Sequence, residues 1–186
     1  MKVRAFLAVE VSPPIRAALI ELKRELQATD AAVRWVRDDA LHATVKFLGS
    51  VPETALPAIE AAVRAVLGER PPLTATVRGL GAFPSATRPR VVWVGLDCPP
   101  LADLAAAADQ ALVPLGFAPE TRPFRAHITF GRVTGPAGRA RLHNALQAHR
   151  DDAFGSCAIA ELIGYRSDLR RGGAVYTKLW TVPFGG

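Results

Sequence analysis

Residues 42–49, His-Ala-Thr-Val-Lys-Phe-Leu-Gly, and residues 127–133, His-Ile-Thr-Phe-Gly-Arg-Val, are the two stretches that decide the fold. Each is a mostly apolar run that begins with histidine and predicts a β-strand. Each precedes a segment whose apolar residues recur at helical spacing, up to residue 67 in the first case and residue 148 in the second. This repeat predicts two similar lobes related by a pseudo-twofold axis.

The rest of the chain alternates between strand and helix patterns, with some strands adjacent, as in an α+β protein. Strands are expected at 2–11, 33–36, 42–48, 73–80, 90–96, 127–133, 158–165 and 174–182. Helices are expected after Ser12, at 56–66, at 101–112 and at 136–148. With no linker or low-complexity stretch, residues 1–186 are expected to form a single domain with two lobes.

Local signals refine these elements. Ser50 and Glu53 have the spacing of a capping box before the second helix. In the first helix, apolar residues spaced by four, three and four leave the basic ones to face solvent: Arg16, Lys23 and Arg24. Gly172-Gly173 is expected to form the last turn.

Composition narrows the class of protein. The chain has 186 residues, of which 49% are hydrophobic and 22% charged, so it can build a core and is not disordered. A net charge of +6 favours polyanionic partners such as nucleic acid. Cys98 and Cys157 form no metal-binding pair, and no apolar run is long enough to span a bilayer. A cytoplasmic protein that does not enter membranes is expected, and no cofactor is expected.

The histidines suggest the chemistry. His42 with Thr44, and His127 with Thr129, repeat the pattern H-x-T. Residues two apart on a strand share a face, so each motif offers an imidazole and a hydroxyl to one space. If the strands are neighbours, one imidazole can take a proton from water while the other protonates a departing oxygen, and the hydroxyls can hold phosphate oxygens. The other two histidines, His143 and His149, are expected to be solvated.

With these motifs the sequence resembles the two-histidine (2H) phosphoesterases, specifically the bacterial and archaeal RNA 2′,3′-cyclic phosphodiesterases once named 2′-5′ RNA ligases. The ordered set that carries the resemblance is 5–9, 42–49, 90–95, 122–124, 127–130, 165–167 and 173–176. One departure is Ala126, which stands where the family often has proline.

The resemblance implies a bilobal α+β fold around a central cleft, and metal-free hydrolysis of an RNA 2′,3′-cyclic phosphate to a 2′-phosphate. It implies that His42 is the proton donor and His127 the proton acceptor, although the residues alone leave the two roles interchangeable. It also implies that Thr44 and Thr129 hold the phosphate. Ligation of 2′-5′ ends is the reverse reaction. The protein is expected to be a monomer.

The resemblance adds two substrate-binding residues, Arg132 for the phosphate and Phe47 for the base. Each lies five positions after the histidine of its motif, so strict alternation would turn both away from the histidine face. Both roles therefore need a strand that twists or ends there, for which Gly131 and Gly49 are suitable. For Phe47, packing in the core is an equal alternative.

Three other functions stay open. The same histidines could serve a small cyclic nucleotide or an ADP-ribose cyclic phosphate, with specificity set by the cleft walls. The fold could also belong to a non-catalytic RNA-binding protein, although two intact H-x-T motifs favour catalysis. A metal enzyme is disfavoured because each motif supplies only one good metal ligand.

Overall fold

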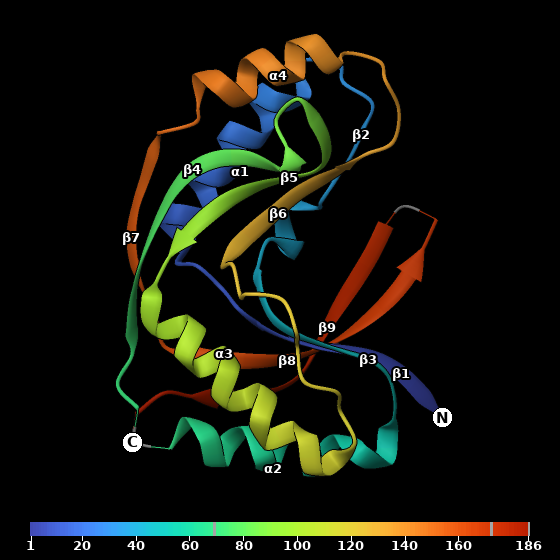
Figure 1. Cartoon of the computed structure of the whole chain (residues 1–186), viewed down its shortest axis with the longest axis vertical. Coiled ribbons are helices and arrows are strands. Elements are labelled where there is room, and N and C mark those ends of the chain that lie inside the picture. The colour runs from blue at the N-terminus through green and yellow to red at the C-terminus, as the bar shows by residue number, and fades with distance from the viewer. Residues whose placement is uncertain (69, 172, 186) are drawn as a thin grey trace.

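The computed structural model describes residues 1–68, 70–171 and 173–185. Its described strands form one antiparallel sheet in the order β7-β4-β5-β6-β3-β1-β8-β9, with the short strand β2 paired to β6. The sheet curls between two pairs of helices (Figure 1). The α+β prediction is therefore confirmed.

The elements have these bounds. The strands are β1 (Lys2–Val9), β2 (Val33–Trp35), β3 (Ala43–Pro52), β4 (Leu73–Ser85), β5 (Arg88–Asp97), β6 (His127–Val133), β7 (Ala153–Ile159), β8 (Glu161–Arg170) and β9 (Gly173–Pro183). The helices are α1 (Pro13–Gln27), α2 (Leu56–Leu67), α3 (Pro99–Leu112) and α4 (Arg139–Ala148), with 3₁₀ turns η1 (Asp38–Ala40), η2 (Glu53–Ala55) and η3 (Val113–Leu115).

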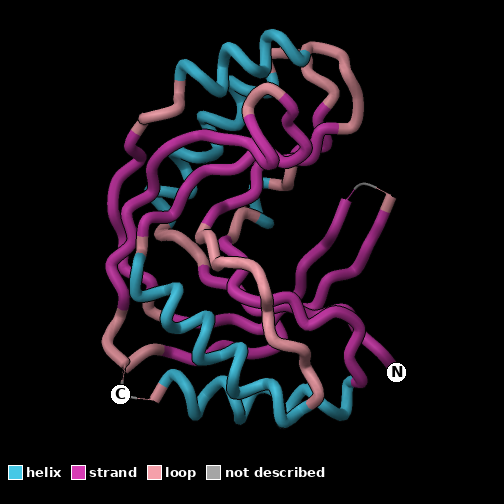
Figure 2. The backbone as a smooth tube through the Cα atoms, in the orientation of Figure 1, coloured by secondary structure: helices cyan, strands magenta, loops and turns pink. Residues whose placement is uncertain are grey.

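The sheet order is symmetric about its centre, where β3 meets β6. On either side follow β1 and β5, then β8 and β4, then β9 and β7. Helices α1 and α4 lie over one half and α2 and α3 over the other, with the strands between them (Figure 2). The repeat of an H-x-T strand followed by a helix is thus present as β3 with α2 and β6 with α4. The two motifs consequently meet at the centre of the sheet.

The two faces of the sheet differ in what covers them. Alternate strand residues such as Leu7, Ala43 and Ile128 pack with the helices in the main core. The opposite face, which we call the inner face, carries a small separate cluster around Phe6 and Tyr165. Because strand residues alternate between faces, the neighbours of Ala43 and Ile128 are directed to the inner face.

Three local predictions are wrong. The capping box does not form, because Ser50 stays in β3, paired with Arg4, and α2 begins only at Leu56 without a side-chain cap. Helix α4 begins at Arg139 rather than residue 136, because Gly138 has a left-handed φ of 66°.

The third wrong prediction is the single strand at 158–165. These residues instead belong to the end of β7 and the start of β8. These strands pair with β4 and β1 on opposite halves of the sheet, and the chain crosses between them at Ala160. Between Ile159 and Glu161 no glycine or proline indicates the break, and the one glycine of the expected strand, Gly164, lies inside β8. The turn expected at Gly172-Gly173 falls partly on Gly172, which lies outside the described residues.

None of the described helices combines the length and apolar character that crossing a bilayer requires.

Candidate active site

A single pairing between the central strands brings the two motifs together. Ala43 of β3 is the antiparallel partner of Ile128 of β6. These are the middle residues of the two H-x-T motifs, and both are buried in the main core. Antiparallel register then sets His42 opposite Thr129, and Thr44 opposite His127, on the inner face. The four predicted residues therefore form one group of two imidazoles and two hydroxyls.

Both imidazoles are oriented in the same way. His42 Nδ1 lies 2.8 Å from the carbonyl oxygen of Ala40, and His127 Nδ1 lies 2.6 Å from that of Arg125. In each case the acceptor is the carbonyl two residues earlier, so Nδ1–H donates to it and Nε2 is left for chemistry. His42 Nε2 is 3.1 Å from Thr44 Oγ1. Each motif thus presents one Nε2 atom from a ring whose orientation its own backbone holds.

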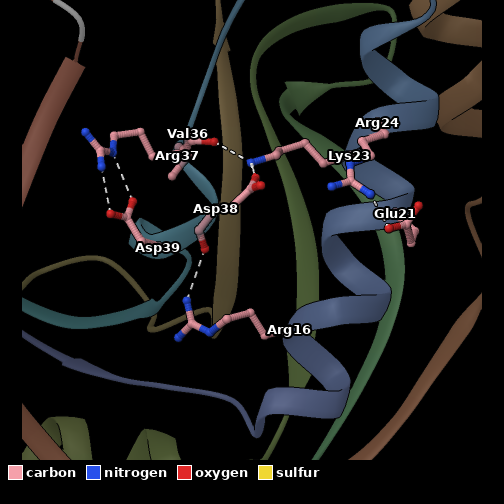
Figure 3. Close-up of polar contacts among 8 residues, drawn as sticks. All are labelled: Arg16, Glu21, Lys23, Arg24, Val36, Arg37, Asp38 and Asp39. Carbon is pink, nitrogen blue, oxygen red and sulfur yellow. Dashed lines mark hydrogen bonds and ion pairs between the residues drawn. The ribbon is translucent and has the colours of Figure 1, made fainter.

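The turn that supplies the Ala40 carbonyl is held by helix α1. The Lys23 ammonium donates to the Val36 carbonyl at 2.6 Å and to the Asp38 carboxylate, while Arg16 donates to the Asp38 carbonyl at 3.2 Å (Figure 3). The prediction that Lys23 faces solvent is wrong, since its side chain is only 3% exposed. It lies between α1 and η1, where it fixes the backbone that leads to His42.

Aromatic rings flank both histidines. The ring centroid of His42 is 4.9 Å from that of Phe6 and 5.1 Å from that of Tyr176, which meets it edge-on at 84°. His127 meets Phe83 in the same manner, at 5.1 Å and 86°. Burial lowers the pKa of His42; the Ala40 carbonyl opposes this effect only in part, and the charge of His127 adds to it. The charge of His127 is therefore close enough to disfavour protonation of His42.

A polar network lies beneath His42. Glu10 accepts hydrogen bonds from the Tyr165 hydroxyl at 2.5 Å and from the Lys178 ammonium at 3.0 Å. Burial opposes ionisation of Glu10, but these two donors outweigh it, so the pKa of Glu10 is lowered and the carboxylate stays charged. A cavity of about 120 Å³ is lined by these residues with Asp39, Ala40, Leu41, His42 and Tyr176. Sequence patterns did not reveal this network, because Glu10 and Lys178 are far apart in the chain.

Arg132 lies on the inner face because β6 contains a bulge. Thr129 pairs with Trp93 and Gly131 with Val92, so Phe130 is an extra residue in β6. Because of this extra residue, the alternation of side chains between the two faces of the sheet shifts by one position after Phe130. Arg132 therefore lies on the same face as Thr129. The Arg132 charge also lowers the pKa of Tyr176, although burial raises that pKa overall. The guanidinium is therefore near a ring that touches His42.

A bulge in β3 likewise places Phe47 on the inner face. Thr44 pairs with Ala8 and Lys46 with Leu7, which makes Val45 the extra residue, and Phe47 then pairs with Phe6. Phe47 shares the inner face with Thr44 and its side chain is 72% exposed. An exposed ring beside the two motifs is available for stacking, so the alternative of core packing is wrong.

The two remaining histidines are not solvated as expected. His143 is half-buried with Nδ1 3.1 Å from the Ala86 carbonyl, and His149 lies 2.8 Å from Asp152. Both belong to the region of α4 and neither joins the group on the inner face. Within residues 1–68, 70–171 and 173–185, no three histidine, cysteine or acidic side chains gather as a metal site would require.

Known proteins resemble this chain over most of its length. The family model of LigT-like phosphoesterases matches residues 9–93. An RNA 2′,3′-cyclic phosphodiesterase of Methanothermobacter thermautotrophicus is 38% identical over 96% of this chain and 97% of its own length, and one of Aeropyrum pernix is 31% identical over 88% and 93%.

Solved structures agree with this similarity. The crystal structure of TT0787 of Thermus thermophilus matches with a TM-score of 0.83 and 28% identity over 98% of each chain. Escherichia coli LigT complexed with 3′-AMP matches with a TM-score of 0.78 and 28% identity over 99% of each chain. The curled sheet with its two pairs of helices is therefore shared with proteins that have been solved experimentally.

Proposed function

Because the chain belongs to the family of LigT-like phosphoesterases, we propose that it hydrolyses the 2′,3′-cyclic phosphate at the end of an RNA to a 2′-phosphate. Relatives that cover nearly the whole chain carry the name of this activity. The observation that carries the proposal is the pairing of Ala43 with Ile128, which joins the two H-x-T motifs on one face.

The geometry supports a reaction by paired proton transfer. His127 Nε2 takes a proton from water, whose oxygen attacks phosphorus, and the bond from phosphorus to the 3′ oxygen breaks. His42 in its protonated form gives the Nε2 proton to that departing oxygen. The carbonyls of Ala40 and Arg125 keep each Nδ1 occupied, so both transfers use Nε2. The proposed ligase activity follows when the 5′ hydroxyl of a second RNA replaces water: its oxygen attacks phosphorus, the bond to the 3′ oxygen breaks, and a 2′-5′ phosphodiester forms.

The remaining predicted residues bind the substrate in this proposal. The hydroxyls of Thr44 and Thr129 donate to non-bridging phosphate oxygens, where negative charge grows in the transition state. Arg132 supplies a guanidinium to the same group, and Phe47 offers its exposed ring to the terminal base. We further propose that the enzyme acts as a monomer in the cytoplasm and needs no metal, since two imidazoles provide both the acid and the base.

The histidine variants test the proposal. His42→Ala and His127→Ala should each lower kcat on an oligonucleotide with a 2′,3′-cyclic phosphate end by about 10²–10⁴-fold, since each removes a positioned acid or base. Binding of the substrate, measured by fluorescence anisotropy, should stay within about threefold of wild type. His143→Ala, on α4 and outside the site, is the matched control and should keep wild-type kcat.

The same assay tests independence from metal. EDTA should leave turnover unchanged, and inhibition by EDTA that zinc or manganese reverses would contradict the proposed mechanism. Wild-type turnover in either His42→Ala or His127→Ala would contradict the assignment of the active site.

A further inference from the structure

The short strand β2 sets a second arginine beside Arg132. Arg34 is the antiparallel partner of Arg132 in the pairing of β2 with β6. Its strand neighbours Val33 and Trp35 pack against the main core, which directs Arg34 to the inner face, where it is exposed. Two guanidinium-bearing residues therefore stand directly opposite each other on the face that carries the histidines.

This pair lacks a counter-charge of its own. Among the residues that the structure describes, no carboxylate makes an ion pair with Arg34 or Arg132, and neither guanidinium donates a hydrogen bond within the protein. Nearby Arg37, in contrast, binds Asp39 with two hydrogen bonds of 3.0 and 2.8 Å. Like charges directly opposite each other on a sheet destabilise it. An anion placed between the two guanidiniums would turn this repulsion into binding energy.

The pair continues the arrangement of the active site. β3 and β2 lie on the same side of β6, with His42 opposite Thr129 and Arg34 opposite Arg132 farther along. The bulge at Phe130 keeps both rows on the inner face. A phosphate held by the two arginines would thus lie next to the group that performs the proton transfers.

We propose that Arg34 is a further substrate-binding residue and that, with Arg132, it forms a two-guanidinium site for a phosphate of the RNA. A guanidinium presents a planar fork of donors that matches phosphate oxygens, so two of them can surround one phosphate. The phosphate is either the cyclic one or the phosphodiester that precedes the terminal nucleotide. This inference rests on the proposed function, which it extends to a residue outside both motifs.

The test compares two substrates and two variants. The substrates are a nucleoside 2′,3′-cyclic monophosphate and a dinucleotide that ends in the same cyclic phosphate. Arg34→Gln should lower kcat/KM by about 10–100-fold on the substrate whose phosphate it binds, the effect of losing one charged hydrogen-bonded contact. Arg37→Gln is the matched control, because its arginine is exposed, nearby and already paired with Asp39; it should retain the wild-type value on both substrates.

The pattern across substrates identifies the phosphate. A loss on the dinucleotide alone assigns the preceding phosphodiester, and an equal loss on both substrates assigns the cyclic phosphate. Wild-type kcat/KM for Arg34→Gln on both substrates would overturn the proposal. So would a loss on both accompanied by a lower melting temperature without ligand, since that would indicate a structural role.

A binding measurement separates this proposal from the proposed function. Without ligand, Arg34→Gln should melt at or above the wild-type temperature, because it removes a repulsion. Inorganic phosphate at constant ionic strength should raise the melting temperature of wild type more than that of Arg34→Gln. If wild type hydrolyses neither substrate, the proposed function fails, and this phosphate shift then decides the role of Arg34: equal shifts in both proteins would overturn it.

Discussion

At the scale of the residue, the two histidines have unequal surroundings, and pH can therefore distinguish their roles. Burial lowers the pKa of His42 below its ordinary value of 6.5. A catalytic acid must be protonated, so the active fraction of the enzyme falls as pH rises through the pKa of the acid. A catalytic base must be neutral, so the active fraction falls as pH decreases through the pKa of the base. If His42 is the proton donor, His42→Ala should keep the decrease in kcat/KM at low pH and lose the decrease at high pH.

We predict that the pKa of His42 lies below 6.5 in the free enzyme and is higher when substrate is bound. The shift between the two is expected because the phosphate of the bound substrate favours the imidazolium form of His42. NMR titration of His42 with and without a nucleoside 2′-monophosphate checks the assignment. Loss of the acidic limb rather than the alkaline limb in His42→Ala would instead make His42 the base.

At the scale of the element, the contact between α1 and η1 should affect both stability and catalysis. Lys23→Met removes the ammonium that holds Val36 and Asp38, and with them the turn whose Ala40 carbonyl orients His42. We expect the free energy of unfolding to fall by about 1–3 kcal/mol, and kcat to fall by up to about a hundredfold. Urea denaturation and steady-state kinetics measure the two effects.

Helix α1 offers a matched control for this variant. Arg24 lies next in sequence, but its pair with Glu21 is on the surface, where both side chains are more than half exposed. Arg24→Met should change the free energy of unfolding by no more than about 0.5 kcal/mol and leave kcat unchanged. Equal effects of the two substitutions would mean that the buried contact of Lys23 does not position His42.

The bulge of β6 is a second feature that tolerates little change, because its Gly131 has no room for a side chain. A Cβ atom on Gly131 would lie 2.6 Å from Val33 Cγ1 and 3.0 Å from the carbonyl oxygen of Arg34. Gly131→Ala must therefore displace β2, which we expect to cost about 1–3 kcal/mol of stability and to weaken binding of a nucleoside 2′-monophosphate by about tenfold. Urea denaturation and calorimetric titration measure both.

Gly135 provides the control, because a Cβ atom there would meet only Ala32 Cβ, at 3.4 Å. Gly135→Ala should keep nearly wild-type stability and affinity. If Gly131→Ala retained both as well, β2 would not depend on close approach at the bulge.

At the scale of the whole molecule, the net charge of +6 should make RNA binding sensitive to salt. We predict that kcat/KM for a cyclic-phosphate-ended oligonucleotide decreases more steeply with salt than for the mononucleotide, by about 0.7 in the log–log slope for each added phosphate contact. Kinetics from low to moderate salt measure this difference. Equal slopes would favour the small cyclic phosphate as the natural substrate.

The order of the strands agrees with the prediction of two related halves, although several predicted element boundaries were wrong. The repeated H-x-T strand and helix indicated two related halves, and the sheet is symmetric about β3 and β6. The capping box and the strand at 158–165 were wrong because pairing with β1 extended β3 through Pro52, and the crossing between β7 and β8 occurred inside an apolar run.

The amino-acid sequence by itself determined the residue types of the proposed site: two histidines and two threonines at a spacing that one strand face can present together. It could not determine whether Arg132 and Phe47 join them, because a bulge is a property of the pairing between strands, and the partners lie far away in the chain. The same holds for Lys23 and Arg34, both of which look like ordinary surface cations until α1 meets η1 and β2 meets β6. Local pattern decides which side chains a strand carries, whereas contacts between distant segments decide which face they reach and which charges they meet.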